Sequence, residues 1–300
     1  MNHRDLLSIR DLSALEIDHL FTRARQFRKS APPRSLESRS VVLLFEKAST
    51  RTRISFEVGI ARLGGHPVVL TLESSQMARG EPLKDTARIL SGYCDAIVMR
   101  TFAHVRIEEM AEFADVPVIN ALTDLLHPCQ VLADCFTLTC RFGPLAGRKI
   151  AWIGDGNNMA NSWINAAVRL GFELVLACPE GYDPDRNILE AALHDGASVT
   201  VVRDPHEAAK GAIAVNTDVW ASMGQEDEAE KRRSAFSGYQ VDASMMGKAL
   251  SHAVFMHCLP AHRGEEVMEE VLEGPHSIVW EQAENRLYVQ EAILEFLLRE

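Results

Sequence analysis

The chain has 300 residues, 47% hydrophobic and 24% charged, a balance typical of a globular protein with room for two cores. Its formal net charge of −11 at pH 7 argues against nucleic acid or an anionic membrane as the main partner. No apolar run is long enough to span a bilayer, the N-terminus lacks the apolar core of a signal peptide, and the cysteines lack paired spacing, so we expect reduced thiols in a cytoplasm.

The first half of the chain alternates strand-like and helix-like segments. A helix is predicted after Ser13, which forms a capping box with Glu16. Short apolar runs predict strands, and segments with helical spacing separate them. The predicted strands are 40–45, 67–72, 95–100 and 116–120, with a helix at 83–90. This alternation is typical of a parallel α/β sheet.

A segment with glycine and proline, 143–147, separates a second alternating series from the first. Further strands are predicted at 149–153, 173–177, 198–202, 212–216, 253–257 and 277–280, and a helix at 283–298 ends the chain. We therefore predict an α/β protein with two doubly wound parallel-sheet domains.

Residues 45–53, Phe-Glu-Lys-Ala-Ser-Thr-Arg-Thr-Arg, lie where the first predicted strand turns into a helix. Free backbone N–H groups and the positive end of the helix dipole meet at such a junction and favour an anion. Hydroxyl groups add donors, and Arg51 and Arg53 add planar guanidinium groups suited to phosphate oxygens. The segment predicts a phosphate site, although a serine cap followed by two solvated arginines fits it equally well.

Polar side chains follow several other predicted strands, where ligands of open α/β sheets bind. The residues at such ends are Arg51, Arg100, His127, Asn157, Asn158, Asp218 and Cys258. The loop after Asp218 contains no arginine or lysine before Lys231, which suits a ligand amino group better than a dicarboxylate. We therefore expect a cleft with an anion on one wall and an amine on the other.

Two cofactor interpretations fit poorly. Gly154 and Gly156 suggest a dinucleotide motif, but Met159 occupies the third glycine position. His257 and Cys258 suggest a metal, but a metal site needs three or four convergent ligands, and the sequence offers His262 no evident companions. We expect neither a metal nor a cofactor.

Together these motifs resemble the aspartate/ornithine carbamoyltransferase family over essentially the whole chain. The segment 45–53 and His-Pro-Cys-Gln at 127–130 resemble its carbamoyl-phosphate motifs. Asp-Gly-Asn-Asn at 155–158, Asp218 with Ser-Met-Gly at 222–224, and His-Cys-Leu-Pro at 257–260 resemble its ornithine branch. Ala48 and Cys129 stand where the family often has other small or polar residues.

The resemblance implies transfer of the carbamoyl group of carbamoyl phosphate to the δ-amine of L-ornithine, giving L-citrulline and phosphate. The residues implied in catalysis are Arg51, Arg100, His127 and Cys258. Those implied to bind carbamoyl phosphate are Ser49, Thr50, Arg51, Thr52, Gln76, Arg100, His127, Pro128, Cys129, Gln130, Cys258, Leu259 and Arg286. Those implied to bind ornithine are Asn158, Asp218, Ser222 and Met223.

The resemblance also implies an organisation. A carbamoyl-phosphate-binding domain would span 1–141, with the C-terminal helix 283–300 packing back on it, and an ornithine-binding domain would span 142–282. Inter-domain helices would join the two. Family members are trimers or multiples of trimers, and Gln76 would reach the phosphate across a subunit boundary.

The attacking amine must be neutral, which at a lysine-like pKa of about 10.4 costs roughly 4–5 kcal/mol at pH 7. Nearby arginines would lower that pKa, and His127 is expected to titrate near neutrality. Two alternatives stay open within the family: an acceptor such as putrescine, or an acylated ornithine. Aspartate fits less well, because its second carboxylate would need a cation. Outside the enzymes, the chain could be a phosphate-ligand sensor without turnover.

Overall fold

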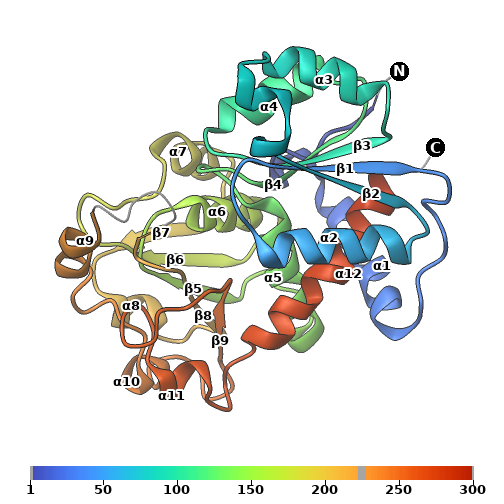
Figure 1. Ribbon diagram of the computed structural model, residues 1–300. Coiled ribbons are helices and arrows are strands. Elements are labelled where there is room, and N and C mark those ends of the chain that lie inside the picture. Colours follow the sequence, from blue (N-terminus) through green and yellow to red (C-terminus); the bar gives the residue numbers. More distant parts are fainter. Residues whose placement is uncertain (1–2, 222–227, 299–300) are drawn as a thin grey trace. The chain divides into compact units, whose positions relative to one another are not determined.

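The computed structural model describes residues 3–221 and 228–298 (Figure 1). Its contacts divide the chain into two compact units: unit 1 comprises Met1–Phe136 and Glu284–Glu300, and unit 2 comprises Thr137–Ala283. Two helices, α5 (Pro128–Phe142) and α12 (Val279–Leu297), contribute residues to both units. The predicted boundary between 141 and 142 falls at the end of α5, whereas the contacts divide the chain within that helix.

Unit 1 is built on a parallel sheet in the order β2-β1-β3-β4. Its strands are β1 (Ser40–Phe45), β2 (His66–Thr71), β3 (Ala96–Arg100) and β4 (Val118–Leu122). Its α-helices, besides parts of α5 and α12, are α1 (Ala14–Lys29), α2 (Thr50–Arg62), α3 (Leu83–Ser91) and α4 (His104–Phe113), with short 3₁₀ turns η1 (Ile9–Asp11), η2 (Leu72–Ser74) and η3 (Gln76–Arg79). The two inner strands are almost entirely buried, as expected when helices cover both faces of a parallel sheet.

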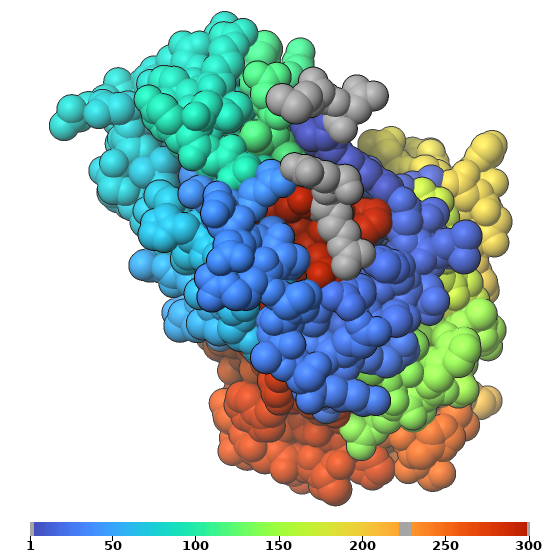
Figure 2. Space-filling model, turned by 90° about the vertical axis from the view of Figure 1, so that its right-hand side faces the viewer, coloured from blue at the N-terminus to red at the C-terminus, as the bar shows by residue number. Residues whose placement is uncertain are grey.

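The C-terminal part of α12 packs on unit 1. Arg23 of α1 pairs with Glu295 (Nε to Oε2, 2.7 Å), and Arg62 of α2 pairs with Glu291 (Nε to Oε1, 3.1 Å). In the space-filling view, atoms of this last segment (red) are surrounded by N-terminal residues (blue) (Figure 2). The helix therefore brings charged side chains from the end of the chain into the interior of unit 1.

Unit 2 is built on a second parallel sheet, in the order β7-β6-β5-β8-β9. Its strands are β5 (Lys149–Ile153), β6 (Glu173–Ala177), β7 (Val199–Val202), β8 (Ala214–Thr217) and β9 (Val254–His257). Its further helices are α6 (Asn158–Leu170), α7 (Arg186–His194), α8 (Pro205–Ala209), α9 (Ala229–Ala235), α10 (Ala243–Met246) and α11 (Glu269–Leu272). The prediction of two doubly wound parallel-sheet domains joined by helices is therefore confirmed.

The strand predicted at 277–280 is wrong. Ser277 forms only an isolated bridge with Phe255, and α12 begins at Val279 instead of the predicted 283. A short apolar run such as Ile278-Val279-Trp280 fits a buried strand and the first turn of a buried helix equally well. Here the run enters a helix: Val279, the first residue of α12, is 0% exposed, and Trp280 is 57% exposed.

Within the described residues, none of the helices combines the length and apolar composition that a membrane span requires. All six cysteines are free thiols.

Candidate active site

The predicted anion site lies at the start of α2. The side chain of Ser49 caps this helix by accepting the Thr52 N–H at 3.3 Å. The first turn contains no acidic residue, so no carboxylate within that turn offsets the positive end of the helix dipole. The local geometry therefore matches that of an anion-binding helix N-terminus.

A pocket of about 560 Å³ lies beside this helix start in unit 1. Its lining includes Ser49, Thr50 and Arg53, and also three carboxylates, from Glu46, Glu57 and Glu73. Arg53 pairs with Glu57 (Nε to Oε2, 3.4 Å), which reduces its attraction for a further anion.

Two other predicted residues lie at the surface of unit 1. Arg51 and Gln76 are exposed, and neither is among the residues that line the pocket. Their side chains are therefore available to a ligand or to another subunit.

The register of the unit 1 sheet fixes the neighbours of this segment. Phe45 at the end of β1 pairs with Arg100 at the end of β3, and the Glu46 N–H donates to the Arg100 carbonyl at 2.9 Å. The Glu46 carboxylate accepts from Arg106 (Nε to Oε2, 3.0 Å) and from the Thr101 hydroxyl. Glu46 therefore holds the backbone at both strand ends, a role that the sequence analysis did not assign to it.

Arg286 of α12 joins two other predicted residues. Its guanidinium donates to the Thr52 hydroxyl at 2.8 Å and to the side-chain oxygen of Gln130. Gln130 in turn donates from Nε2 to Asp134 Oδ1 at 2.8 Å. Thr52, Gln130 and Arg286 are all buried, so this network fixes the start of α2 and the first turn of α5 together.

His127 immediately precedes α5 and is buried, at 5% exposure. Burial, reinforced by the positive charges of Arg286 and Arg100, lowers the pKa of His127 well below its usual value of 6.5. The expectation that His127 titrates near neutrality is therefore wrong. The imidazole is neutral at pH 7 and can offer a hydrogen bond, but not a positive charge.

Pro128 and Cys129 form the first turn of α5 and are buried. The Cys129 thiol donates to the Asn120 carbonyl at 3.3 Å, and burial raises its pKa to about 12. The side chain of Cys129 is therefore a packed, unreactive thiol.

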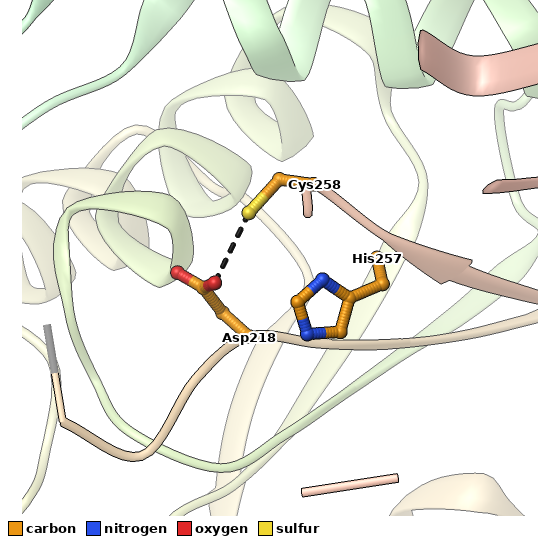
Figure 3. A group of neighbouring side chains, drawn as sticks. All are labelled: Asp218, His257 and Cys258. Atoms are coloured by element: carbon orange, nitrogen blue, oxygen red, sulfur yellow. Dashed lines mark hydrogen bonds between the residues drawn. The ribbon is translucent and has the colours of Figure 1, made fainter. Parts of the chain in front are cut away.

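In unit 2, Asp218 and Cys258 follow neighbouring strands. Thr217 of β8 pairs in register with His257 of β9, so the next residue of each strand lies at the same edge of the sheet. The Cys258 thiol donates to Asp218 Oδ1 at 3.0 Å (Figure 3). The register of two parallel strands thus brings together residues that are 40 positions apart.

Asn157 orients the Asp218 carboxylate. As the N-cap of α6 it accepts the Met159 N–H at 2.9 Å through Oδ1, and its Nδ2 donates to Asp218 Oδ2 at 2.9 Å. Asn158 is the first residue of the same helix. Asn157 is predicted as a strand-end residue and as part of the 155–158 motif, and its position just before a helix is the signal for this cap.

Arg232 of α9 places a buried cation in the same part of unit 2. It directly follows Lys231, the residue that ends the loop without arginine or lysine. It donates to Asp155 Oδ2 and to the Trp220 carbonyl, both at 2.8 Å. Burial nevertheless prevails over this ion pair and raises the pKa of Asp155 to about 6. Because 77 positions separate Arg232 from Asp155, no local pattern predicts the pair.

Ser222 and Met223, predicted to bind ornithine, lie outside the described residues.

Two groups of three side chains within the described residues have atoms close enough to hold a metal ion. One comprises Asp218, His257 and Cys258; the other comprises His262, Glu265 and Glu266, so the statement that His262 has no companions is wrong. In the first group both ring nitrogens of His257 already have partners, Leu259 N–H and Glu266. A metal there would have to displace one of them.

The fold and these sites define a class of protein. Two parallel α/β units, one with an anion-binding helix N-terminus and buried arginines, the other with a buried carboxylate at its strand ends, are typical of a protein that acts on small charged molecules. The chain belongs to the aspartate/ornithine carbamoyltransferase family. The family's carbamoyl-P binding domain matches residues 4–139, and its Asp/Orn binding domain matches residues 146–297.

The chain is 51% identical to the ornithine carbamoyltransferase of Geobacter sulfurreducens over 301 aligned positions, which cover 99% of each chain. It is 54% identical to that of Nitratidesulfovibrio vulgaris, covering 97% of this chain and 98% of the relative. Among solved structures, it is similar to ornithine carbamoyltransferase from Pyrococcus furiosus, with a TM-score of 0.93, 47% identity and coverage of 97% and 96%.

Proposed function

We propose that this chain is an ornithine carbamoyltransferase, which transfers the carbamoyl group of carbamoyl phosphate to the δ-amine of L-ornithine. The observation that carries the proposal is its likeness, over nearly its full length, to curated enzymes of that name. The sites of both units agree with it in chemistry. No metal or cofactor is needed for the reaction.

Unit 1 is proposed to bind carbamoyl phosphate. The phosphate would accept hydrogen bonds from the start of α2 and from Ser49, Thr50 and Thr52, with Arg51 supplying a charged fork. Arg100, His127 and Gln130 would bind the carbamoyl group. His127, being neutral, would polarise the carbonyl oxygen by donating a hydrogen bond.

The network around Arg286 supports this assignment. Arg286 holds Thr52 and Gln130, so residues proposed for the phosphate and for the carbamoyl group share one buried anchor. Preorganised donors of this kind stabilise charge without reorganising during the reaction. The roles of Pro128 and Cys129 would be confined to the main chain. Cys258 and Leu259 are proposed to close around the carbamoyl group.

Unit 2 is proposed to bind ornithine through Asp218 and Asn158, with Ser222 and Met223 of the following loop. Asp218 is 8% exposed, and its carboxylate accepts from Asn157, Cys258 and its neighbour's N–H (Val219, 2.9 Å). An oriented carboxylate is a suitable partner for a substrate ammonium group. Among the described residues of unit 2, the only buried arginine or lysine is Arg232, which is paired with Asp155. An aspartate acceptor would lack a cation for its second carboxylate.

In the proposed reaction the neutral δ-amine attacks the carbamoyl carbon. A C–N bond forms, the C–O bond to phosphate breaks with its electron pair leaving on phosphate, and the departing phosphate takes up the proton that the amine loses. Positioned cations stabilise the charge that develops on the carbonyl oxygen and the departing phosphate. The same cations favour the neutral form of the amine.

We further propose a homotrimer or a multiple of trimers, in which Gln76 of one subunit reaches the phosphate of another. Three apolar side chains of unit 1 support an interface here: Ile54 and Val58 on α2 and Val68 on β2 are 53%, 42% and 41% exposed. Strand β2 is also the edge of its sheet. The free cysteines agree with a cytoplasmic location.

A colorimetric citrulline assay tests the proposed function. The purified protein is incubated with carbamoyl phosphate and, separately, with L-ornithine, putrescine, an acylated ornithine or aspartate, and both phosphate and the carbamoylated product are measured. We expect turnover with L-ornithine at least 100-fold faster than with the other amines. Turnover with another amine alone would replace the acceptor, and binding of carbamoyl phosphate without turnover on any amine would favour a sensor.

A further inference from the structure

A turn with an unusual backbone follows β9. Leu259 has a φ of +61°, in the left-handed region that branched residues rarely adopt. Its N–H donates to Nδ1 of the His257 ring at 2.8 Å. The side chain of His257 therefore holds the turn that contains Cys258 and Leu259.

The other ring nitrogen of His257 meets Glu266. The distance from Nε2 to Glu266 Oε1 is 3.2 Å, and both side chains are completely buried. Nδ1 must be unprotonated to accept the Leu259 N–H, so Nε2 carries the ring proton. A carboxylate can only accept, so Glu266 stabilises this tautomer and disfavours the alternative.

Glu266 is anchored independently of the ring. Its main-chain carbonyl accepts the Val241 N–H at 2.9 Å, and its Oε1 also accepts the His262 N–H at 2.5 Å. Its hydrogen-bond partner Val241 and its chain neighbour Val267 belong to the apolar core of unit 2. A buried carboxylate in such surroundings is costly unless its oxygens receive hydrogen bonds. Its Oε1 receives two, and one of them comes from the His257 ring.

We propose that Glu266 is a positioning residue: it selects the Nε2–H tautomer of His257 and thereby holds the Cys258–Leu259 turn in place. The inference rests on the proposed function, which assigns Cys258 and Leu259 to the substrate. Glu266 accepts from the His257 ring, and the ring in turn holds Leu259. It acts through the ring, as the third group that orients an imidazole does in other enzymes.

The first test reads the tautomer without any substrate. In protein labelled with ¹⁵N-histidine, the His257 signals are assigned with a His257→Asn variant. We expect protonated Nε2 and unprotonated Nδ1 in the parent and in Glu266→Gln, whose amide oxygen still accepts. Glu266→Met removes the acceptor and should lose the preference. A parent ring protonated at Nδ1 would overturn the proposal.

The second test measures citrulline formation. Glu266→Met should lower kcat at least tenfold, and Glu266→Gln should recover most of the loss. The neighbouring Glu265→Met, which removes a surface carboxylate paired with Arg233, is the matched control and should match the parent. Parental kcat in Glu266→Met would overturn the proposal.

His257→Asn separates positioning from a merely structural effect. Asparagine Oδ1 can replace Nδ1 as the acceptor of the Leu259 N–H, but it has no tautomer for Glu266 to select. In this background Glu266→Met should change kcat less than twofold. If it costs tenfold there as well, Glu266 does not act through the ring.

A further pair of variants tests the proposal even if Glu266→Met fails to fold. If Glu266→Met does not fold, His257→Asn should retain at least a third of the parental kcat, whereas His257→Gln, which places its amide near Nε2, should lose tenfold. Equal activity of these two variants would contradict the proposal. If the parent makes no citrulline, the proposed function fails, while the tautomer measurement still decides whether Glu266 positions His257.

Discussion

The guanidinium of Arg286 in α12 donates a 2.8 Å hydrogen bond to the hydroxyl of Thr52 in α2, 234 positions earlier in the chain. Both side chains are buried, and the same guanidinium also donates to Gln130. The last helix is therefore part of the proposed phosphate site. It does not merely close the fold.

The Thr52–Arg286 bond should be measurable as stability. Thr52→Val conserves shape but leaves a buried guanidinium N–H without its acceptor, so the free energy of unfolding should fall by about 1–3 kcal/mol. Thr50→Val is the matched control. Thr50 lies two residues before Thr52 and is exposed, so its substitution should change the free energy of unfolding by no more than about 0.5 kcal/mol. Urea unfolding measures both. Equal stability of the two variants would mean that the hydrogen bond contributes nothing.

Arg51 should affect turnover and not the fold. Arg51→Ala removes a charge-assisted contact to phosphate and should cost at least about 3 kcal/mol in kcat/KM, roughly 150-fold. Because Arg51 is exposed, the unfolding midpoint should hardly change. Arg34→Ala, at an exposed arginine paired with Glu37, serves as the control. Turnover within threefold of the parent would remove Arg51 from the site.

The pH dependence of turnover should report the substrate amine, without a contribution from His127. If the neutral δ-amine reacts, kcat/KM for ornithine should rise with pH from 6 towards 8 by nearly one decade per unit. His127 adds no second slope here, because its pKa lies well below 6.5. His127→Asn should give the same slope at a lower rate. A profile that flattens in the variant alone would show that His127 does titrate in this range.

The same pKa shift has a consequence for stability. Below pH 6.5 the unfolded chain protonates His127, whereas the folded chain keeps it neutral, so the unfolded state binds more protons. The free energy of unfolding should therefore decrease as pH falls from 6.5 towards the lowered folded pKa, by up to about 1.4 kcal/mol per unit from this group. His127→Asn should lose that part of the slope in urea titrations between pH 6.5 and 5. An unchanged slope would contradict the burial effect.

Asp218 should govern ornithine and leave carbamoyl phosphate nearly unaffected, since most of the residues proposed to bind carbamoyl phosphate belong to unit 1. Asp218→Asn places a neutral amide where an ammonium partner is proposed, so KM for ornithine should rise at least tenfold. Isothermal titration should give a nearly unchanged Kd for carbamoyl phosphate. Loss of carbamoyl-phosphate binding as well would refute this division.

The exposed apolar side chains of α2 predict an interface. Val58→Glu should disrupt the assembly, because burying an unpaired carboxylate is costly. Light scattering after size exclusion should give a mass of about three times 33.3 kDa, or a multiple, for the parent and a lower mass for the variant. Val105→Glu on α4, where the parent side chain is 65% exposed, is the control and should keep the parental mass. A monomeric parent would refute the trimer.

Much of the fold follows from short-range patterns. The apolar runs at 40–45, 149–153 and 173–177 predict strands, and they are β1, β5 and β6 with the same bounds. Such patterns succeed because residues buried on both faces of a parallel sheet are apolar without interruption. They fail where a run is short, as at Ile278-Val279-Trp280, which packing turns into the start of a helix.

The chemical character of the site was also predictable in part. Ser49 at the start of α2 and Asp218 and Cys258 at strand ends are found where the sequence places them, because strand and helix boundaries are local properties. Their roles toward substrates stay predictions.

Only the tertiary structure decided which distant groups meet. No local pattern pairs Thr52 with Arg286 or Asp155 with Arg232, since these contacts depend on how helices pack on a sheet. The protonation state of His127 was likewise decided by packing. A free imidazole titrates near neutrality, but burial beside two guanidinium groups removes that titration, because a charge that loses water next to like charges is strongly disfavoured.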